Sequence, residues 1–231
     1  MEPFAVAGYR VVRCDLRGFG DSELRPGPFS DLGEVQELLD ALEINQVALV
    51  GASYGGRVAL EFTLTHPERV WALVLVGAGL RDIDWSDDVR RGFEEEEALV
   101  ERGDIDAAVE LNLRMWVDGP SRTAADVDSE VRAYVGEMQR RAFEVGLAVP
   151  DAGPGESFDP PASSRLREVA CPTLVLVGDL DQPDILRVAH QLASGIPGAQ
   201  RATMHGTAHV PNMERPEGFN ELVLDFLRAS N

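Results

Sequence analysis

Short apolar runs recur along the chain and give the first indication of its fold. Runs of this length, apolar almost throughout, are typical of parallel strands that are covered on both faces. We predict strands at residues 9–14, 46–50, 70–76, 173–177 and, more weakly, 200–204.

Segments with helical periodicity lie between and after these runs. Residues 31–42 and 56–65 place apolar side chains three and four positions apart, and residues 219–227 close the chain in the same way. Alternating strands and helices predict an α/β fold with a doubly wound, mainly parallel sheet.

The alternation stops between residues 82 and 164. This stretch is rich in Glu, Asp and Arg, has helical spacing, and contains no run that reads as a strand. We therefore predict a helical lid insertion at 82–164, and a core built from residues 1–81 and 165–231. A helical insertion over the strand ends covers whatever site lies there.

Composition narrows the choice of partners. A chain of 231 residues accommodates one main domain, and its 40 acidic against 21 basic residues give a net charge of −19. That charge disfavours nucleic acid and anionic membrane surfaces as partners. No window of about 18 apolar residues and no signal-peptide pattern is seen, so we expect a cytoplasmic protein. Cys14 and Cys171 are expected to be buried thiols.

The sequence GASYG at residues 51–55 is the strongest chemical signal. It follows a predicted strand and runs directly into a predicted helix, which is the context of a nucleophile elbow with Ser53 as nucleophile. In such a tight turn we expect Gly51 and Gly55 to lack side chains because neighbouring backbone comes close. The backbone N–H of Tyr54 is then the predicted oxyanion donor.

A serine hydroxyl requires a general base, and His209 is the best candidate. It lies in a glycine-containing loop between the last predicted strand and the terminal helix, with His205 as its alternative in the same loop. His66 follows a helix and His190 lies within one, so packing or surface roles fit them better.

The acid that orients the histidine is expected at the end of the preceding strand. Asp181 lies further into that loop and is preferred, and Asp179, directly after the strand, is the alternative. The chain order serine, acid, histidine is the order found in hydrolases with a nucleophile elbow.

These motifs resemble the α/β-hydrolase superfamily, and within it the lidded serine hydrolases similar to 3-oxoadipate enol-lactonases and related esterases. The resemblance covers nearly the whole chain and includes DLRGFGDS, GASYGG, THPERVWALVLV, LVLVGDLD and GTAHVPNMERPEGF. It implies hydrolysis of a small-molecule ester or lactone through an acyl-enzyme, without a metal or organic cofactor. The same scaffold also carries C–C bond hydrolysis and perhydrolysis.

The chain departs from that pattern at its front. Members of the superfamily begin with two antiparallel strands and a third strand that ends in an HG loop, and no such segment precedes residue 9. We expect a gap in mid-sheet beside residues 46–50, the loss of the second oxyanion donor, and weak catalysis. A non-catalytic fragment or binding module is therefore the alternative function.

The lid is expected to wall the substrate pocket. Among its apolar side chains, the candidates for substrate contact are Trp116, Met115, Met138 and Phe143. Each of them also fits a role in helix packing.

Overall fold

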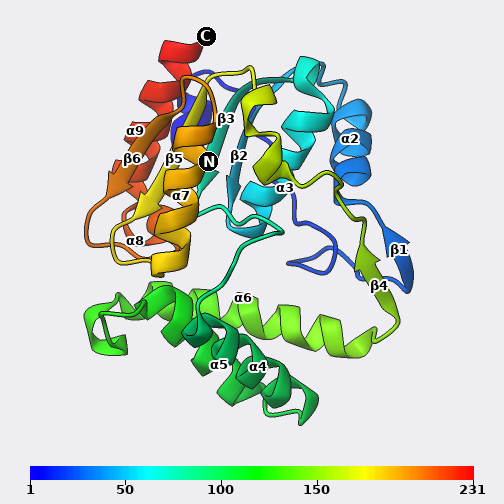
Figure 1. The fold of residues 1–231 in the computed structure, drawn as a ribbon, viewed down its shortest axis with the longest axis vertical. Helices are drawn as coiled ribbons and strands as arrows, with labels where there is room; N and C mark the ends of the chain where they lie inside the picture. Colours follow the sequence, from blue (N-terminus) through cyan, green and yellow to red (C-terminus); the bar gives the residue numbers. More distant parts are fainter.

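The computed structural model describes residues 1–231, apart from the side chains of residues 154 and 155. Its main sheet has four parallel strands in the order β2-β3-β5-β6 (Figure 1). The strands are β2 (Val47–Ala52), β3 (Val70–Val76), β5 (Thr173–Gly178) and β6 (Gln200–Met204). The prediction of a mainly parallel α/β sheet is thus confirmed for these four runs.

Helices cover both faces of this sheet. On one face α3 (Tyr54–Thr65) and α7 (Pro183–Gly195) pack against β3 and β5, and on the other α9 (Pro216–Ser230) does so. The smaller helices of the core are α1 (Glu2–Val6), α2 (Asp31–Ala41) and α8 (Pro211–Glu214). The apolar side chains of β3 and β5 are almost fully buried, as expected for strands covered on both sides.

The predicted strand at residues 9–14 is wrong. These residues form no strand and are exposed or half-exposed, Cys14 included. A strand must pair its backbone groups with a neighbour, and within the described chain nothing pairs with this run. Of its side chains, Tyr9 packs against the core cluster to which α9 contributes. Without a strand at residues 9–14, β2 is the outermost strand, and Val50 on it is 47% exposed.

The lid consists mainly of helices, as predicted. It contains α4 (Asp87–Glu101), α5 (Ile105–Asn112), a π-helical turn (Leu113–Asp118) and α6 (Ser129–Ala148). Figure 1 shows these helices together beyond the carboxyl ends of β5 and β6, with α6 nearest the core. This is the end of a parallel sheet at which open α/β folds place their ligand sites.

The prediction that residues 82–164 contain no strand is wrong at one place. β4 (Ala152–Gly155) pairs in parallel with β1 (Gly27–Phe29) and forms a separate two-stranded sheet beside the lid (Figure 1). Both strands are very short and rich in Gly and Pro, so their sequences contain no apolar run from which a strand could be predicted. The main sheet receives no strand from the insertion, and its exact boundaries stay a prediction.

None of the helices in the described part of the chain is long and apolar enough to span a bilayer.

Candidate active site

Ser53 lies at the junction of β2 and α3 in a strained backbone conformation. Its φ is 51° and its ψ is −115°, a combination that residues other than glycine rarely adopt. Strain of this kind costs about 1–3 kcal/mol and persists only where the surroundings enforce it. Here the Ser53 N–H donates to the Val76 carbonyl at 2.9 Å, which ties the turn to the end of β3.

Two glycines allow this turn, and one of them differs from our expectation. A Cβ at Gly51 would come within 2.3 Å of the Gly55 carbonyl oxygen, as the elbow predicts. A Cβ at Gly55 would meet nothing within 4 Å, so the expectation for that position is wrong. The crowded position is Gly56, where a Cβ would lie 2.6 Å from that of Ala78. The reason is that Gly56 faces the segment after β3, whereas Gly55 faces open space.

The structure brings Ser53, His209 and Asp181 together in one chain of hydrogen bonds. His209 Nε2 lies 2.8 Å from Ser53 Oγ, and His209 Nδ1 lies 2.8 Å from Asp181 Oδ2. The Asp181 side chain is almost completely buried and also accepts a hydrogen bond from the Gln182 N–H at 2.7 Å. The imidazole is therefore fixed with one nitrogen on a carboxylate and the other on the serine, as general-base activation requires.

The two alternatives weighed for these roles pair with each other instead. His205 Nδ1 lies 2.9 Å from Asp179 Oδ2, and the His205 side chain is 86% exposed. Burial alone would raise the pKa of Asp179, but hydrogen bonds from His205 and from the Gly206 N–H hold it below its ordinary value. The chain thus holds two Asp–His pairs, and the one that contacts Ser53 is that of Asp181 and His209.

Tyr54 begins α3, directly after the serine. The first N–H groups of a helix have no acceptor within it, and they carry the positive end of the helix dipole. An oxyanion that forms at a carbonyl attacked by Ser53 would meet this end of α3. The role of the Tyr54 N–H as oxyanion donor stays a prediction.

Among the predicted lid residues, Trp116 is the one that contacts His209. Its ring centroid lies 4.7 Å from that of His209, and its backbone carbonyl accepts a hydrogen bond from the backbone N–H of His209 at 3.2 Å. Trp85 and Phe93 extend this contact into an aromatic cluster, at 6.1 Å and 6.0 Å from Trp116. Sequence reasoning missed these two, because no local motif signals a contact between α4 and the segment after β3.

Phe19 is a second aromatic side chain beside the elbow that the sequence did not single out. Its ring lies 5.7 Å from that of Tyr54, and it is 45% exposed. The turn that carries it is held by Asp15, whose carboxylate accepts the Asp21 N–H at 3.1 Å. Phe19 belongs to DLRGFGDS, a segment that entered the prediction only as part of the family resemblance.

One face of α6 is turned toward the core. Tyr134, Met138 and Arg141 follow one another at intervals of four and three residues and so share this face. Arg141 forms an ion pair of 2.8 Å with Asp21, in the loop that carries Phe19. Tyr134 and Met138 are 54% and 53% exposed, although they are apolar or aromatic. Met138 therefore remains a candidate for substrate contact.

Met115 and Phe143 lie elsewhere. Both pack against the small apolar core that α4 and α5 form within the lid. Met115 approaches α4 so closely that a Cβ at Gly92 would lie 2.6 Å from its sulfur. The structure does not bring these two predicted residues to Ser53, because they face the interior of the lid.

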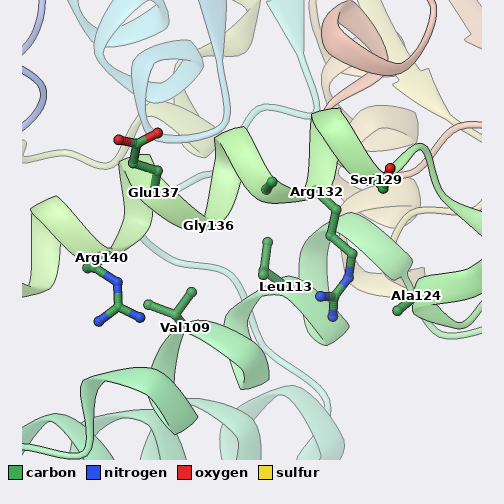
Figure 2. A pocket seen from close by; sticks show the side chains of 9 residues that line it. Val109, Leu113, Ala124, Ser129, Arg132, Gly136, Glu137 and Arg140 are labelled. Carbon is green, nitrogen blue, oxygen red and sulfur yellow. The ribbon is translucent and has the colours of Figure 1, made fainter.

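A pocket of about 570 Å³ lies within the lid, between α5 and α6 (Figure 2). Val109 and Leu113 form its apolar floor, and Arg132 and Arg140 line it from α6. Arg132 is held by Glu110 and by the buried Asp118. No triad residue lines this pocket, so we do not assign the chemistry to it.

The charged groups beside the elbow are paired. Arg81 makes a two-pronged ion pair of 2.8 and 3.0 Å with the buried Glu61, and Arg57 lies 3.9 Å from the buried Asp31. Within the described residues, no three His, Cys, Asp or Glu side chains are grouped to hold a metal ion.

Comparisons with known proteins identify the family of the chain. Residues 1–222 match the model of the alpha/beta hydrolase family. The chain is 32% identical over 237 aligned positions to a 2-hydroxy-6-oxononadienedioate/2-hydroxy-6-oxononatrienedioate hydrolase of Cupriavidus pinatubonensis, covering 98% of this chain and 79% of that protein.

Solved structures give the same fold. A thermophilic esterase from Thermogutta terrifontis is 25% identical, with a TM-score of 0.73 over 94% of this chain and 78% of its own. The enol-lactonase from Burkholderia xenovorans LB400 is 22% identical, with a TM-score of 0.70 over 93% of this chain and 79% of its own, and supports the fold alone. With its family model, its curated relative and its sheet in agreement, the chain belongs to the alpha/beta hydrolase family and is a hydrolase of that fold.

Proposed function

We propose that this hydrolase cleaves a small carboxylic ester or lactone through an acyl-enzyme formed on Ser53. The observation that carries the proposal is the hydrogen-bond chain from Asp181 through His209 to Ser53, with both distances at 2.8 Å. An exposed serine without such partners has no means of losing its proton at neutral pH.

The reaction follows from these contacts. Ser53 Oγ attacks the carbonyl carbon while His209 Nε2 takes its proton, and Asp181 stabilises the imidazolium that results. The Tyr54 N–H donates to the oxyanion. His209 then returns the proton to the leaving alcohol, and a water molecule repeats the sequence to release the acid.

The surroundings favour a neutral, partly apolar substrate. Trp116 and Phe19 present aromatic surface on either side of the nucleophile, at His209 and at Tyr54. The guanidinium groups nearest to Tyr54 are those of Arg57 and Arg81, and each faces a buried carboxylate: Arg81 is hydrogen-bonded to Glu61, and Arg57 lies 3.9 Å from Asp31. A substrate carboxylate would have to displace such a partner, and leaving a buried acid unpaired is costly.

A second candidate is hydrolysis of a C–C bond beside a ketone. It is favoured by the relative from Cupriavidus pinatubonensis, which by name acts on keto-dicarboxylates. Such compounds have no ester to cleave, so their hydrolysis breaks a carbon–carbon bond. Parallel assays with p-nitrophenyl acetate and with 2-hydroxy-6-oxononadienedioate distinguish ester hydrolysis from C–C bond hydrolysis. We expect the ester to be turned over faster.

The two Asp–His pairs provide a matched test of the mechanism. We expect His209→Ala and Asp181→Asn to lower kcat by about 10⁴, as damage to a triad does. His205→Ala and Asp179→Asn make the same chemical changes at the exposed pair and should leave kcat within about twofold. The measurement is p-nitrophenyl acetate hydrolysis at saturating substrate.

A fluorophosphonate probe separates an enzyme from a non-catalytic scaffold, since it labels only an activated serine. We expect one label, on Ser53, that Ser53→Ala abolishes. Ser194→Ala is the control, because Ser194 Oγ also lies near a histidine, at 3.4 Å from His190 Nδ1, but at an exposed site. The proposed function is contradicted if the wild-type chain is not labelled. It is also contradicted if kcat falls equally in the variants of the Asp181–His209 pair and in those of the Asp179–His205 pair.

A further inference from the structure

A small cluster of buried and half-buried polar side chains lies next to the elbow. Asp31 is the first residue of α2 and Tyr54 the first residue of α3, so the cluster joins the N-terminal ends of two helices. The Tyr54 hydroxyl donates to Asp31 Oδ2 at 2.6 Å, a short bond of the kind that a charged acceptor makes. Only 5% of Asp31 is exposed, which is uncommon for an aspartate.

Arg57 completes the cluster from the next turn of α3. Its guanidinium carbon lies 4.2 Å from the centre of the Tyr54 ring, and Nη2 lies 3.9 Å from Asp31 Oδ2. Burial and the hydrogen bond to Asp31 raise the pKa of Tyr54 to about 12. The phenol therefore keeps its proton and remains a donor throughout the range in which a hydrolase works.

The cluster is poorly arranged if stability is its only purpose. Among the described residues, Asp31 Oδ1 and Arg57 Nε are buried side-chain atoms without a hydrogen-bond partner in the protein. A buried carboxylate loses the free energy of its hydration, and an incompletely bonded ion pair does not recover all of it. Unsatisfied buried groups of this kind call for an explanation beyond stability.

The location of the cluster supplies one. The peptide between Ser53 and Tyr54 carries the oxyanion donor, and its backbone is strained at Ser53, where φ is 51°. On one side this peptide is anchored by its carbonyl, that of Ser53, which accepts the Arg57 N–H at 3.1 Å and the Gly79 N–H at 3.3 Å. The preceding peptide is tied to the end of β3 by the Ser53 N–H on the Val76 carbonyl. On the other side the peptide between Ser53 and Tyr54 is anchored by the Tyr54 side chain, which Asp31 and Arg57 hold. Without the anchor on the Tyr54 side, the carbonyl bonds remain, but the strain at Ser53 can relax through a small shift of the Tyr54 N–H.

We propose that Asp31 is a positioning residue for the reaction, which acts by holding Tyr54 so that its backbone N–H points at the developing oxyanion. The inference rests on the proposed function and deepens it. Asp31 touches neither substrate nor reacting atoms and acts through Tyr54 alone. Because the oxyanion exists only in the transition states of acylation and deacylation, the loss of this control lowers kcat and leaves substrate binding unchanged.

Tyr54→Phe is the most direct test, because it removes one oxygen and keeps the ring under Arg57. Loss of an oxyanion donor costs about 10²–10³ in rate, and misdirecting one costs less, so we expect kcat for p-nitrophenyl acetate to fall about tenfold. KM should stay within about twofold. Asp31→Ala should give the same loss, and combining it with Tyr54→Phe should add nothing further, since both changes break one contact. Asp31→Asn retains an acceptor and should recover part of kcat.

Asp40→Asn is the matched control. Asp40 also lies on α2 and also pairs with an arginine, with Arg69 at 2.9 Å, but far from the elbow. It should leave kcat and KM unchanged. Thermal melting of each variant accompanies the kinetics, so that a loss of folded protein is separated from a loss of rate.

The outcomes distinguish this inference from the function on which it rests. A wild-type chain without fluorophosphonate labelling at Ser53 overturns both. An active wild-type chain together with an unchanged kcat in Tyr54→Phe overturns only the role of Asp31. A lower melting temperature with normal kcat, or a raised KM with normal kcat, also overturns it, because these indicate a purely structural role or direct substrate contact. If Asp31→Ala does not fold, Tyr54→Phe decides alone.

Discussion

Replacing Ser53 by glycine should leave the fold more stable than replacing it by alanine, although both changes remove the nucleophile. Both variants lose the hydrogen bond to His209 equally, so their difference isolates the backbone. At a φ of 51° and a ψ of −115°, alanine keeps the strain of about 1–3 kcal/mol, whereas glycine adopts the mirror-image region freely. Glycine loses about 0.5–1 kcal/mol more conformational entropy on folding. The balance favours glycine by about 1 kcal/mol.

Urea unfolding followed by tryptophan fluorescence and by circular dichroism measures this difference. Ser194 in α7 provides the matched control, because it is exposed and lies within a regular helix. There the usual order should hold, with the alanine variant more stable than the glycine variant by up to about 1 kcal/mol. If the alanine variant at position 53 has a free energy of unfolding equal to or higher than that of the glycine variant, the argument from backbone strain at the elbow is refuted.

Two further predictions concern stability. Gly56→Ala should cost about 1–3 kcal/mol because its Cβ would lie 2.6 Å from that of Ala78, whereas Gly55→Ala, with nothing within 4 Å, should be neutral or stabilising in thermal melts; equal losses would contradict the crowding at Gly56. Burial raises the pKa of Glu96 despite a hydrogen bond from Asn112, so the folded state disfavours its charged form. Glu96→Gln should therefore stabilise the protein at pH 7, with a gain that disappears as the pH falls below about 4, and an equal gain in urea unfolding at both pH values would be inconsistent with this cause.

The contact between Ser53, Asp181 and His209 could be anticipated because each residue follows the carboxyl end of a predicted strand of the parallel sheet. Parallel strands bring their carboxyl ends to one edge, so residues distant in sequence are predicted to meet there. The loop after the last strand offered two histidines, of which His209 was preferred and His205 was kept as the alternative. The structure shows His205 paired with Asp179 at the surface.

The parts that sequence did not predict depend on partners that the local pattern does not specify. The apolar run at residues 9–14 has the composition of a strand, but a strand exists only when a neighbour pairs with it. Phe19, Trp85 and Phe93 acquire their places near the site through contacts between segments far apart in the chain. At Gly55, the motif was interpreted as a steric requirement, but the close approach, from Ala78 in the segment after β3, concerns Gly56 instead.

The long separation between the nucleophile and its base has a consequence for folding kinetics. Ser53 and His209 are 156 residues apart, with the lid between them, and His209 follows the last strand, β6. Contacts of such high sequence separation form late, because the loop-closure entropy is lost before the contact stabilises the chain. A nascent or partly refolded chain can therefore contain a finished elbow while its serine remains as inert as a free hydroxyl group. Reactivity toward a fluorophosphonate should return after helical circular dichroism during refolding, which makes the serine a reporter of the last step of assembly.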